Sequence, residues 1–244
     1  MPADLEALYS REYFEGKRAT GYPSYLAETE LIADNFDVRL RWIERLAPPG
    51  RLLDVGAAYG LLLARAVQRG WDAMGVEIAA DCAAEAQHIA GVPVVVGDFA
   101  TVELPSGFDV ITMFDVIEHM RDPLVTLRRA ATLLTPGGLL VVETADAASL
   151  WARLLGRYWY FLDPPQHLFY FTAAGLESTA RESGFGAVAG VARPGRRVSL
   201  ANIAFKLAHS APAPLRRLTP MLARLPGSVP LNFGDGLLMA FRKA

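Results

Sequence analysis

Apolar and polar positions alternate along the chain in blocks that predict strands and helices in turn. The run Leu52–Val55 is apolar apart from one acid and predicts a buried strand. Small residues follow from Gly56 to Gly60, and apolar residues then recur with helical spacing from Leu61 to Val67. A strand, a glycine turn and a helix in this order direct backbone N–H groups and the positive end of a helix at a ligand.

The alternation continues along the chain and predicts βαβ units around a parallel sheet. Up to residue 145 the expected elements are helices at Ala27–Leu46, Cys82–Ile89 and Pro123–Leu134, and strands at Ala73–Glu77, Val92–Val96, Phe108–Phe114 and Leu139–Glu143. Beyond that they are helices at Leu150–Leu155, Ala174–Glu182, Leu200–Leu207 and Leu215–Leu225, and strands at Gly186–Val191 and Leu237–Phe241. The predicted fold class is α/β, with a doubly wound, mostly parallel sheet, a helical N-terminal segment and a helical insertion before the last strand.

Composition narrows the class of protein. Hydrophobic residues make up 52% of the 244 residues, which is typical of a folded globular protein. The net charge of −2 is too near neutral for an electrostatic nucleic-acid binder, and the single cysteine, Cys82, excludes an intrachain disulfide. The N-terminus has no long apolar core, and no apolar run is typical of a transmembrane helix. We therefore expect a cytoplasmic protein.

Acids stand at the predicted carboxyl ends of three strands, where open parallel sheets bind their ligands. These acids are Glu77, Asp98 and Asp115. An acid after the second strand is placed to accept hydrogen bonds from both ribose hydroxyls of a nucleoside, and we assign this role to Glu77. The alternative for Glu77 is a solvated acid at a strand end.

The glycine unit resembles motif I of the class I S-adenosylmethionine-dependent methyltransferases. Asp54, Gly56 and Gly60 match this motif, whereas Ala58 stands where a middle glycine is common. The stretch Asp115–Met120 is similar to the family pattern D-x-[IL]-E-H-[VI] after the fourth strand. The resemblance covers residues 52–143 in the family's order.

A looser resemblance links residues 164–171 to the small-molecule branch of this family, which includes ubiquinone-type O-methyltransferases and enzymes of sugar and natural-product pathways. The resemblance implies a Rossmann-like fold and a single methyltransferase domain over residues 1–244. Its parts would be an N-terminal helical flap (1–47), a cofactor-binding core (48–145) and a substrate-side half (146–244) with a lid or docking insertion (193–230). It implies S-adenosylmethionine as methyl donor, S-adenosylhomocysteine as product and a small-molecule acceptor.

The resemblance also suggests roles for cofactor-binding residues. Asp98 would accept a hydrogen bond from the adenine amino group and Phe99 would line the ring, although an Asx turn is the alternative for Asp98. Asp115 or the backbone of Phe114 would receive the α-amino group. The full expected set is Asp54, Gly56, Ala57, Tyr59, Gly60, Glu77, Ile78, Asp98, Phe99, Phe114 and Asp115.

Three interpretations of Glu118 and His119 stay open. Both residues could be structural, with His119 hydrogen-bonded near the mouth of the cofactor site. His119 could instead be a general base, because its reference pKa near ~6.5 suits proton transfer. Finally, Asp115, Glu118 and His119 could hold a divalent metal, as is thought of some quinone O-methyltransferases with a similar stretch. Metal is the least favoured of the three, and we predict no metal ligand.

An aromatic, proline-bearing loop follows the fifth strand, where the family places residues that face the substrate. We predict His167 as the second candidate for the base, and Trp159, Tyr160 and Tyr170 as substrate-binding residues. The alternative is that these rings fill the core below the loop and that His167 bonds to a backbone carbonyl.

The predicted activity is methyl transfer to a small molecule, most simply O-methylation in a secondary-metabolite, quinone or glycan pathway. N- or C-methylation, a non-catalytic nucleoside-binding module and an NAD-dependent oxidoreductase are the alternatives; the last normally has G-x-G-x-x-G, which is absent after Gly56. Arginines in the 193–230 insertion could meet an anionic substrate or a phospholipid surface, or form a solvated basic face. A homodimer is a further expectation.

Overall fold

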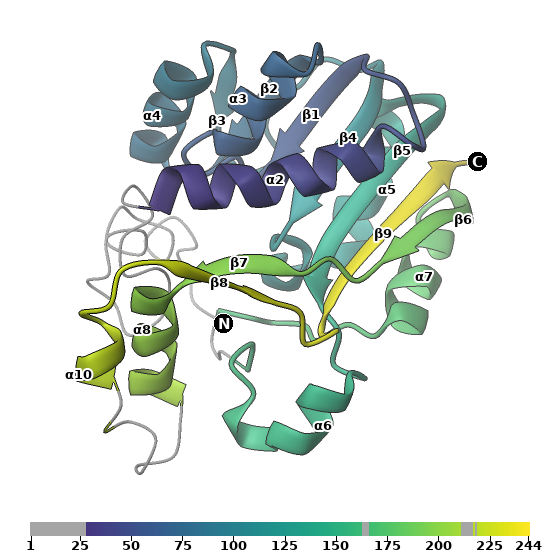
Figure 1. Cartoon of the computed structure of the whole chain (residues 1–244). Helices are drawn as coiled ribbons and strands as arrows, with labels where there is room; N and C mark the ends of the chain where they lie inside the picture. Colours follow the sequence, from purple (N-terminus) through teal and green to yellow (C-terminus); the bar gives the residue numbers. More distant parts are fainter. Residues whose placement is uncertain (1–27, 163–165, 211–216, 218) are drawn as a thin grey trace.

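The computed structural model describes residues 28–162, 166–210, 217 and 219–244 of the chain (Figure 1). The first 27 residues of the predicted N-terminal flap lie outside the described part. In the described part, no helix is long and apolar enough to cross a membrane.

A seven-stranded sheet forms the centre of the fold, with the order β3-β2-β1-β4-β5-β9-β6. Neighbours from β3 to β5 are parallel, whereas β9 is antiparallel to β5 and β6. The strands are β1 (Arg51–Val55), β2 (Asp72–Glu77), β3 (Val94–Val96), β4 (Phe108–Phe114), β5 (Leu134–Ala145), β6 (Phe185–Ala192) and β9 (Gly236–Lys243). The predicted doubly wound, mostly parallel sheet is confirmed. Strand order reverses between β1 and β4, and this is where such sheets bind ligands.

Helices cover both faces of the sheet because successive strand residues point to opposite sides. On one face, Leu52 and Val141 pack with residues of α2, α3 and α4, such as Leu40 and Leu63. Figure 1 shows α2 lying across this face. The helices are α2 (Thr29–Ile43), α3 (Leu61–Gln68), α4 (Ala80–Ala90), α5 (Pro123–Leu133), α6 (Leu150–Leu155), α7 (Ala173–Glu182), α8 (Leu200–Ser210) and α10 (Thr219–Leu222), with short 3-10 turns η2 (Ile117–His119) and η3 (Gly156–Tyr158).

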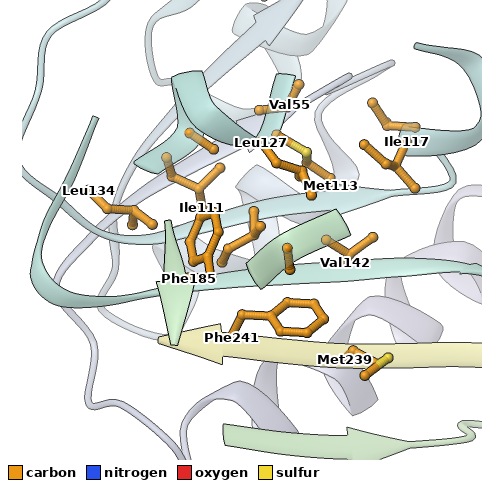
Figure 2. Close-up of a cluster of buried hydrophobic side chains, with 14 of the residues drawn as sticks. Val55, Ile111, Met113, Ile117, Leu127, Leu134, Val142, Phe185, Met239 and Phe241 are labelled. Carbon is orange, nitrogen blue, oxygen red and sulfur yellow. The ribbon is translucent and has the colours of Figure 1, made fainter. Parts of the chain in front are cut away.

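The opposite face holds the larger buried cluster, in which strand residues meet α5 and α7 (Figure 2). Ile111 and Val142 come from the middle of the sheet, Leu127 comes from α5, and Phe185 and Phe241 lie in β6 and β9. Ile111, Leu127, Val142 and Phe241 are fully buried. This packing fixes the strands relative to one another, and therefore holds the strand tips in place.

The insertion before the last strand differs from the prediction. We expected only helical pieces there, but β7 (Arg196–Ser199) and β8 (Ser228–Leu231) form an antiparallel pair on either side of α8 and α10. Four-residue strands that carry two arginines, two serines and a proline have no regular alternation of apolar and polar residues, so the sequence did not reveal them. Helix α10 is four residues long within the segment expected to be helical at 215–225.

Side-chain hydrogen bonds hold this pair of strands against α2 and against the end of β5. The Asn35 side chain donates to the carbonyl of Arg197 at 2.9 Å and accepts from its backbone N–H at 2.8 Å. At the base of the pair, Arg193 donates to the buried Asp146 at 2.6 Å. Strands β7 and β8 therefore lie beside the sheet, below α2 in the view of Figure 1.

Candidate functional site

The turn between β1 and α3 is a tight corner in which three residues have positive φ. These are Gly56 at +75°, Ala58 at +47° and Gly60 at +74°. A Cβ atom on Gly56 would lie 2.6 Å from Val116 Cγ2, and one on Gly60 would lie 2.8 Å from a backbone oxygen of α4. Glycine is therefore required at both ends of the corner by conformation and by close approach. Ala58 is the exception, because it adopts a left-handed conformation that costs an L-residue about 1–2 kcal/mol.

Glu77, at the tip of β2, closes this corner. One of its oxygens accepts a hydrogen bond from the Ala58 N–H at 2.8 Å, and the other accepts from the Ala79 N–H at 3.0 Å. The side chain is buried, and burial raises its pKa while the two backbone donors lower it. Glu77 is therefore not a solvated strand-end acid, and its position depends on the backbone of the glycine corner.

Asp54 lies next to this corner, near the tip of β1. It is buried and accepts a hydrogen bond from the Thr112 hydroxyl at 2.7 Å. The pKa of Asp54 is raised to about 7, mainly by burial and to a smaller extent by the nearby Glu77 carboxylate, while the Thr112 hydrogen bond lowers it. Two buried acids on neighbouring strands thus share one end of the sheet.

Asp98 and Phe99 follow β3 at the same edge. Asp98 forms the Asx turn that was its alternative interpretation, because its Oδ1 accepts from the Ala100 N–H at 2.8 Å. Phe99 is buried in the core, with the Arg129 guanidinium 5.5 Å from its ring centre. Both residues also line the cavity beside the glycine corner. The Asx turn holds one carboxylate oxygen of Asp98 and leaves the other without a hydrogen bond among the described residues.

A cavity of about 660 Å³ extends from the glycine corner to the β7–β8 pair, a size within the usual range for small-molecule sites. Most of the predicted site residues lie in its wall. These are Asp54, Gly56, Ala57, Glu77, Ile78, Asp98, Phe99, Phe114, Asp115, His119, Tyr160 and His167. Four others do not line it: Tyr59, Gly60, Trp159 and Tyr170. Tyr59 is buried with α3 and α4 residues instead.

Asp115 follows β4 in a left-handed conformation, with φ at +53°. A non-glycine residue in this conformation is uncommon and is often found at functional sites. More than a third of Asp115 is exposed, and the residue lines the cavity. Its neighbour Phe114 also lines the cavity and stacks on Phe36 of α2, with ring centres 6.2 Å apart.

Arg39 and Glu143 form a buried, bidentate ion pair in the same wall. The guanidinium of Arg39 in α2 donates to both Glu143 oxygens, at 2.7 and 2.8 Å. Neither residue was predicted as part of the site. Glu143 is an acid at the carboxyl end of a predicted strand, which is the feature that identified Glu77, so the sequence could have indicated it. Arg39 is a single arginine in an amphipathic helix, and no sequence pattern marks it as a site residue. Arg196, Trp151 and Phe233 also line the cavity and were not predicted.

Glu118, His119 and His167 come together at another part of the cavity wall. One potential ligand atom from each lies within 4.8 Å of the others. The two imidazole rings meet edge to face, with centres 4.7 Å apart. Asp115 does not belong to this group. Burial of Glu118 and the charge of the nearby Asp115 raise the pKa of Glu118 to about 8, against a smaller lowering by His167. The two histidines that were predicted separately as candidate bases therefore lie next to each other in the structure.

The aromatic residues of the loop after β5 divide between core and cavity. Trp159 is buried and donates its indole N–H to Asp235 at 3.2 Å, whereas Tyr170 is exposed. Tyr160 and Phe161 line the cavity, with ring centres 4.5 Å apart. Tyr160 and Phe161 therefore form an aromatic wall of the cavity, and the buried Trp159 packs edge to face on Phe161.

A glycine corner after the first strand, a buried acid at the tip of the second and a cavity over the point where strand order reverses define a nucleoside-binding α/β protein. The chain belongs to the methyltransferase domain family, whose model matches residues 27–189. Solved SAM-dependent methyltransferases have the same fold. That from Thermotoga maritima is 19% identical with a TM-score of 0.61, covering 90% of this chain and 95% of its own. That from Archaeoglobus fulgidus is 19% identical with a TM-score of 0.60, covering 98% and 100%.

The curated relatives are similar over a shorter range. A ubiquinone biosynthesis O-methyltransferase of Paracidovorax citrulli is 33% identical over 119 residues, which are 45% of this chain and 50% of the relative. The protein of the same name from Chromobacterium violaceum is 35% identical over 119 residues, which are 45% and 51% of the two chains. The chain therefore spans about half the length of the curated relatives it matches.

Proposed function

We propose that this protein transfers a methyl group from S-adenosylmethionine to a hydroxyl group of a small molecule. The observation that carries the proposal is the corner between β1 and α3, where Glu77 bonds to the backbone of the glycine turn beside a cavity of about 660 Å³. Membership of the methyltransferase domain family supports the same donor.

The residues around the corner fit the adenosine part of this donor. Glu77 keeps lone pairs beyond its two backbone bonds, and these are the acceptors that ribose hydroxyls require. Asp98 keeps one carboxylate oxygen for the adenine amino group, and Phe99 and Ile78 line the wall beside it. Gly56 keeps the corner in its bent form, since a Cβ there would collide with Val116 and its φ is positive. The charged end of the donor would lie toward Asp115.

The reaction demands little covalent chemistry from the protein. The acceptor oxygen forms a bond to the methyl carbon while the carbon–sulfur bond breaks, and the bonding electrons stay on sulfur, which becomes a neutral thioether. The hydroxyl proton leaves to a base. Alignment of donor and acceptor alone can supply about 7–11 kcal/mol, so the walls of the cavity are expected to account for most of the catalysis.

The acceptor would occupy the end of the cavity formed by the aromatic wall and the β7–β8 pair. His119 and His167 lie in this part of the wall and assist the loss of the proton, either by accepting it or by holding a cation that acidifies the hydroxyl. Tyr160 and Phe161 present ring surfaces that suit a flat or apolar acceptor. The curated relatives named for ubiquinone biosynthesis O-methylation support an oxygen acceptor.

Calorimetric titration tests the donor. S-adenosylmethionine and S-adenosylhomocysteine should bind with one site per chain, and NAD should not bind at the same concentrations. A screen of phenols and sugars for release of S-adenosylhomocysteine then tests the transfer. Binding of the donor without turnover of any acceptor would favour a non-catalytic nucleoside-binding module, and tighter binding of NAD would refute the proposal.

A further inference from the structure

We propose that Glu118, His119 and His167 form a site for one divalent transition-metal ion at the acceptor end of the cavity. Their ligand atoms lie within 4.8 Å of one another. In a tetrahedral set with bonds of about 2.0–2.2 Å the ligand atoms lie about 3.3–3.6 Å apart, so side-chain movements of up to about 1 Å would close the set on an ion. Two imidazoles and a carboxylate suit zinc, iron(II), cobalt or manganese.

The carboxyl group of Glu118 points to a missing ligand. Glu118 is only 2% exposed, and neither of its oxygens has a hydrogen-bond partner in the part of the chain that the structure describes. A buried carboxylate is normally paired, hydrogen-bonded or bound to a metal. An ion between Glu118 and the two histidines would supply the positive charge that the carboxylate lacks.

A backbone carbonyl fixes the tautomer of each histidine. Nδ1 of His119 donates to the carbonyl of Gln166 at 3.0 Å, and Nδ1 of His167 donates to the carbonyl of Phe161 at 2.7 Å. A carbonyl oxygen can only accept, so the proton of each neutral ring is on Nδ1 and the lone pair is on Nε2. Metal-bound histidines usually donate their other ring N–H to just such a partner, which fixes the ring and strengthens the ligand.

The two segments that carry these residues are joined by their backbones. The carbonyl of Glu118 accepts hydrogen bonds from Leu168 N–H at 2.8 Å and from Phe169 N–H at 3.1 Å. The loop that carries His167 is thereby tied to the 3-10 turn that carries Glu118 and His119. The three side chains are consequently arranged by the fold before any ion binds.

This set differs from the one that the local sequence suggested. Asp115, Glu118 and His119 lie within five residues of each other, but the structure brings His167 rather than Asp115 into the group. Three protein ligands would leave the ion at least one further coordination position. If the proposed function holds, that position would take the acceptor oxygen, and a bound metal lowers the pKa of such a hydroxyl. Ion binding itself does not depend on the proposed function.

Cobalt(II) is the probe for the ligand set. The purified chain, freed of metal by a chelator and dialysis, is titrated with Co²⁺ by calorimetry and visible absorption, and with Zn²⁺ in competition. We expect one site per chain with cobalt ligand-field bands, and a 10- to 100-fold or greater loss of affinity in His167→Ala and Glu118→Gln. His88→Ala, an exposed histidine of α4, controls for surface binding, and Asp115→Asn tests the alternative ligand set. His88→Ala should bind Co²⁺ as the unaltered protein does, and Asp115→Asn should keep one Co²⁺ site per chain.

Circular dichroism shows that each variant is folded, and titration of the unaltered protein with S-adenosylmethionine separates this proposal from the previous one. Failure of Co²⁺ and Zn²⁺ to bind, with normal binding of the donor, would overturn the metal site and leave the proposed function intact. Unchanged binding of Co²⁺ by a folded His167→Ala variant, or its loss in Asp115→Asn alone, would overturn the ligand set. Should Glu118→Gln fail to fold, His167→Ala still decides the outcome, with His88→Ala as its control.

Discussion

The corner between β1 and α3 is most directly perturbed by the substitution Glu77→Gln. The carboxylate accepts from two backbone donors, Ala58 N–H at 2.8 Å and Ala79 N–H at 3.0 Å. A glutamine keeps one acceptor oxygen, but its amide N–H₂ would face the other backbone N–H, so one hydrogen bond is lost. The corner in which the donor is proposed to bind is therefore no longer held from both sides.

The magnitude follows from the charge on the acceptor. A hydrogen bond to a charged group contributes about 1.5–3 kcal/mol, and the ribose of the donor would lose one such bond when the carboxylate becomes an amide. Since about 1.4 kcal/mol is a factor of ten, the dissociation constant of S-adenosylmethionine should rise roughly 10- to 100-fold. The free energy of unfolding should change less than the free energy of binding. The neutral amide removes the cost of burying a charge, and that same cost is what raises the pKa of Glu77 in the folded protein.

Calorimetric titration of the unaltered protein and the variant gives the affinities, and urea unfolding without ligand gives the stabilities. Glu103→Gln is the matched control, because Glu103 is exposed on the connection between β3 and β4, and this variant should bind the donor normally. A folded Glu77→Gln variant whose affinity stays within twofold of the unaltered protein would refute the ribose role of Glu77. An equal loss in the Glu103 variant would show that the effect is not specific to the corner.

Three further predictions concern the same part of the fold. Ala58→Gly should raise the free energy of unfolding by up to about 1 kcal/mol, because it removes the strain of an alanine in the left-handed conformation and adds only the smaller entropy cost of glycine. Urea unfolding measures this change, and a loss of stability would contradict the prediction. Arg39→Ala should lower the free energy of unfolding by about 3–5 kcal/mol, since it leaves Glu143 buried without its partner, whereas a double leucine variant of the pair should lose less. Burial raises the pKa of Asp54 from 3.8 to about 7, so the folded chain keeps a proton that the unfolded chain releases, and stability should fall as pH rises from about 4 to 7. In Asp54→Asn this fall in the free energy of unfolding between pH 4 and 8 should be smaller by up to roughly 4 kcal/mol. Urea unfolding at a series of pH values measures it, and an unchanged pH dependence would exclude Asp54 as the source of the fall.

The sequence alone determined the features that depend on neighbouring residues. Alternation of apolar blocks predicted the strands and helices of the sheet as far as Glu143. The spacing of Gly56 and Gly60 after a strand predicted the tight corner, and the position of Glu77 at a strand end predicted an acid beside it. Local conformation decides all three, because a positive φ, a helical period and a strand end are each encoded within a few residues.

Only the tertiary structure decided which distant residues meet. Arg39 pairs with Glu143 because α2 packs across the sheet, and His167 joins Glu118 because the later loop hydrogen-bonds to the Glu118 carbonyl. The β7–β8 pair forms against α2 through Asn35 rather than through an apolar pattern of its own. Sheet register, helix packing and long-range hydrogen bonds set these contacts, and none of them leaves a periodic signal in the residues concerned. The corner was therefore predictable from spacing, whereas the acceptor end of the cavity was not.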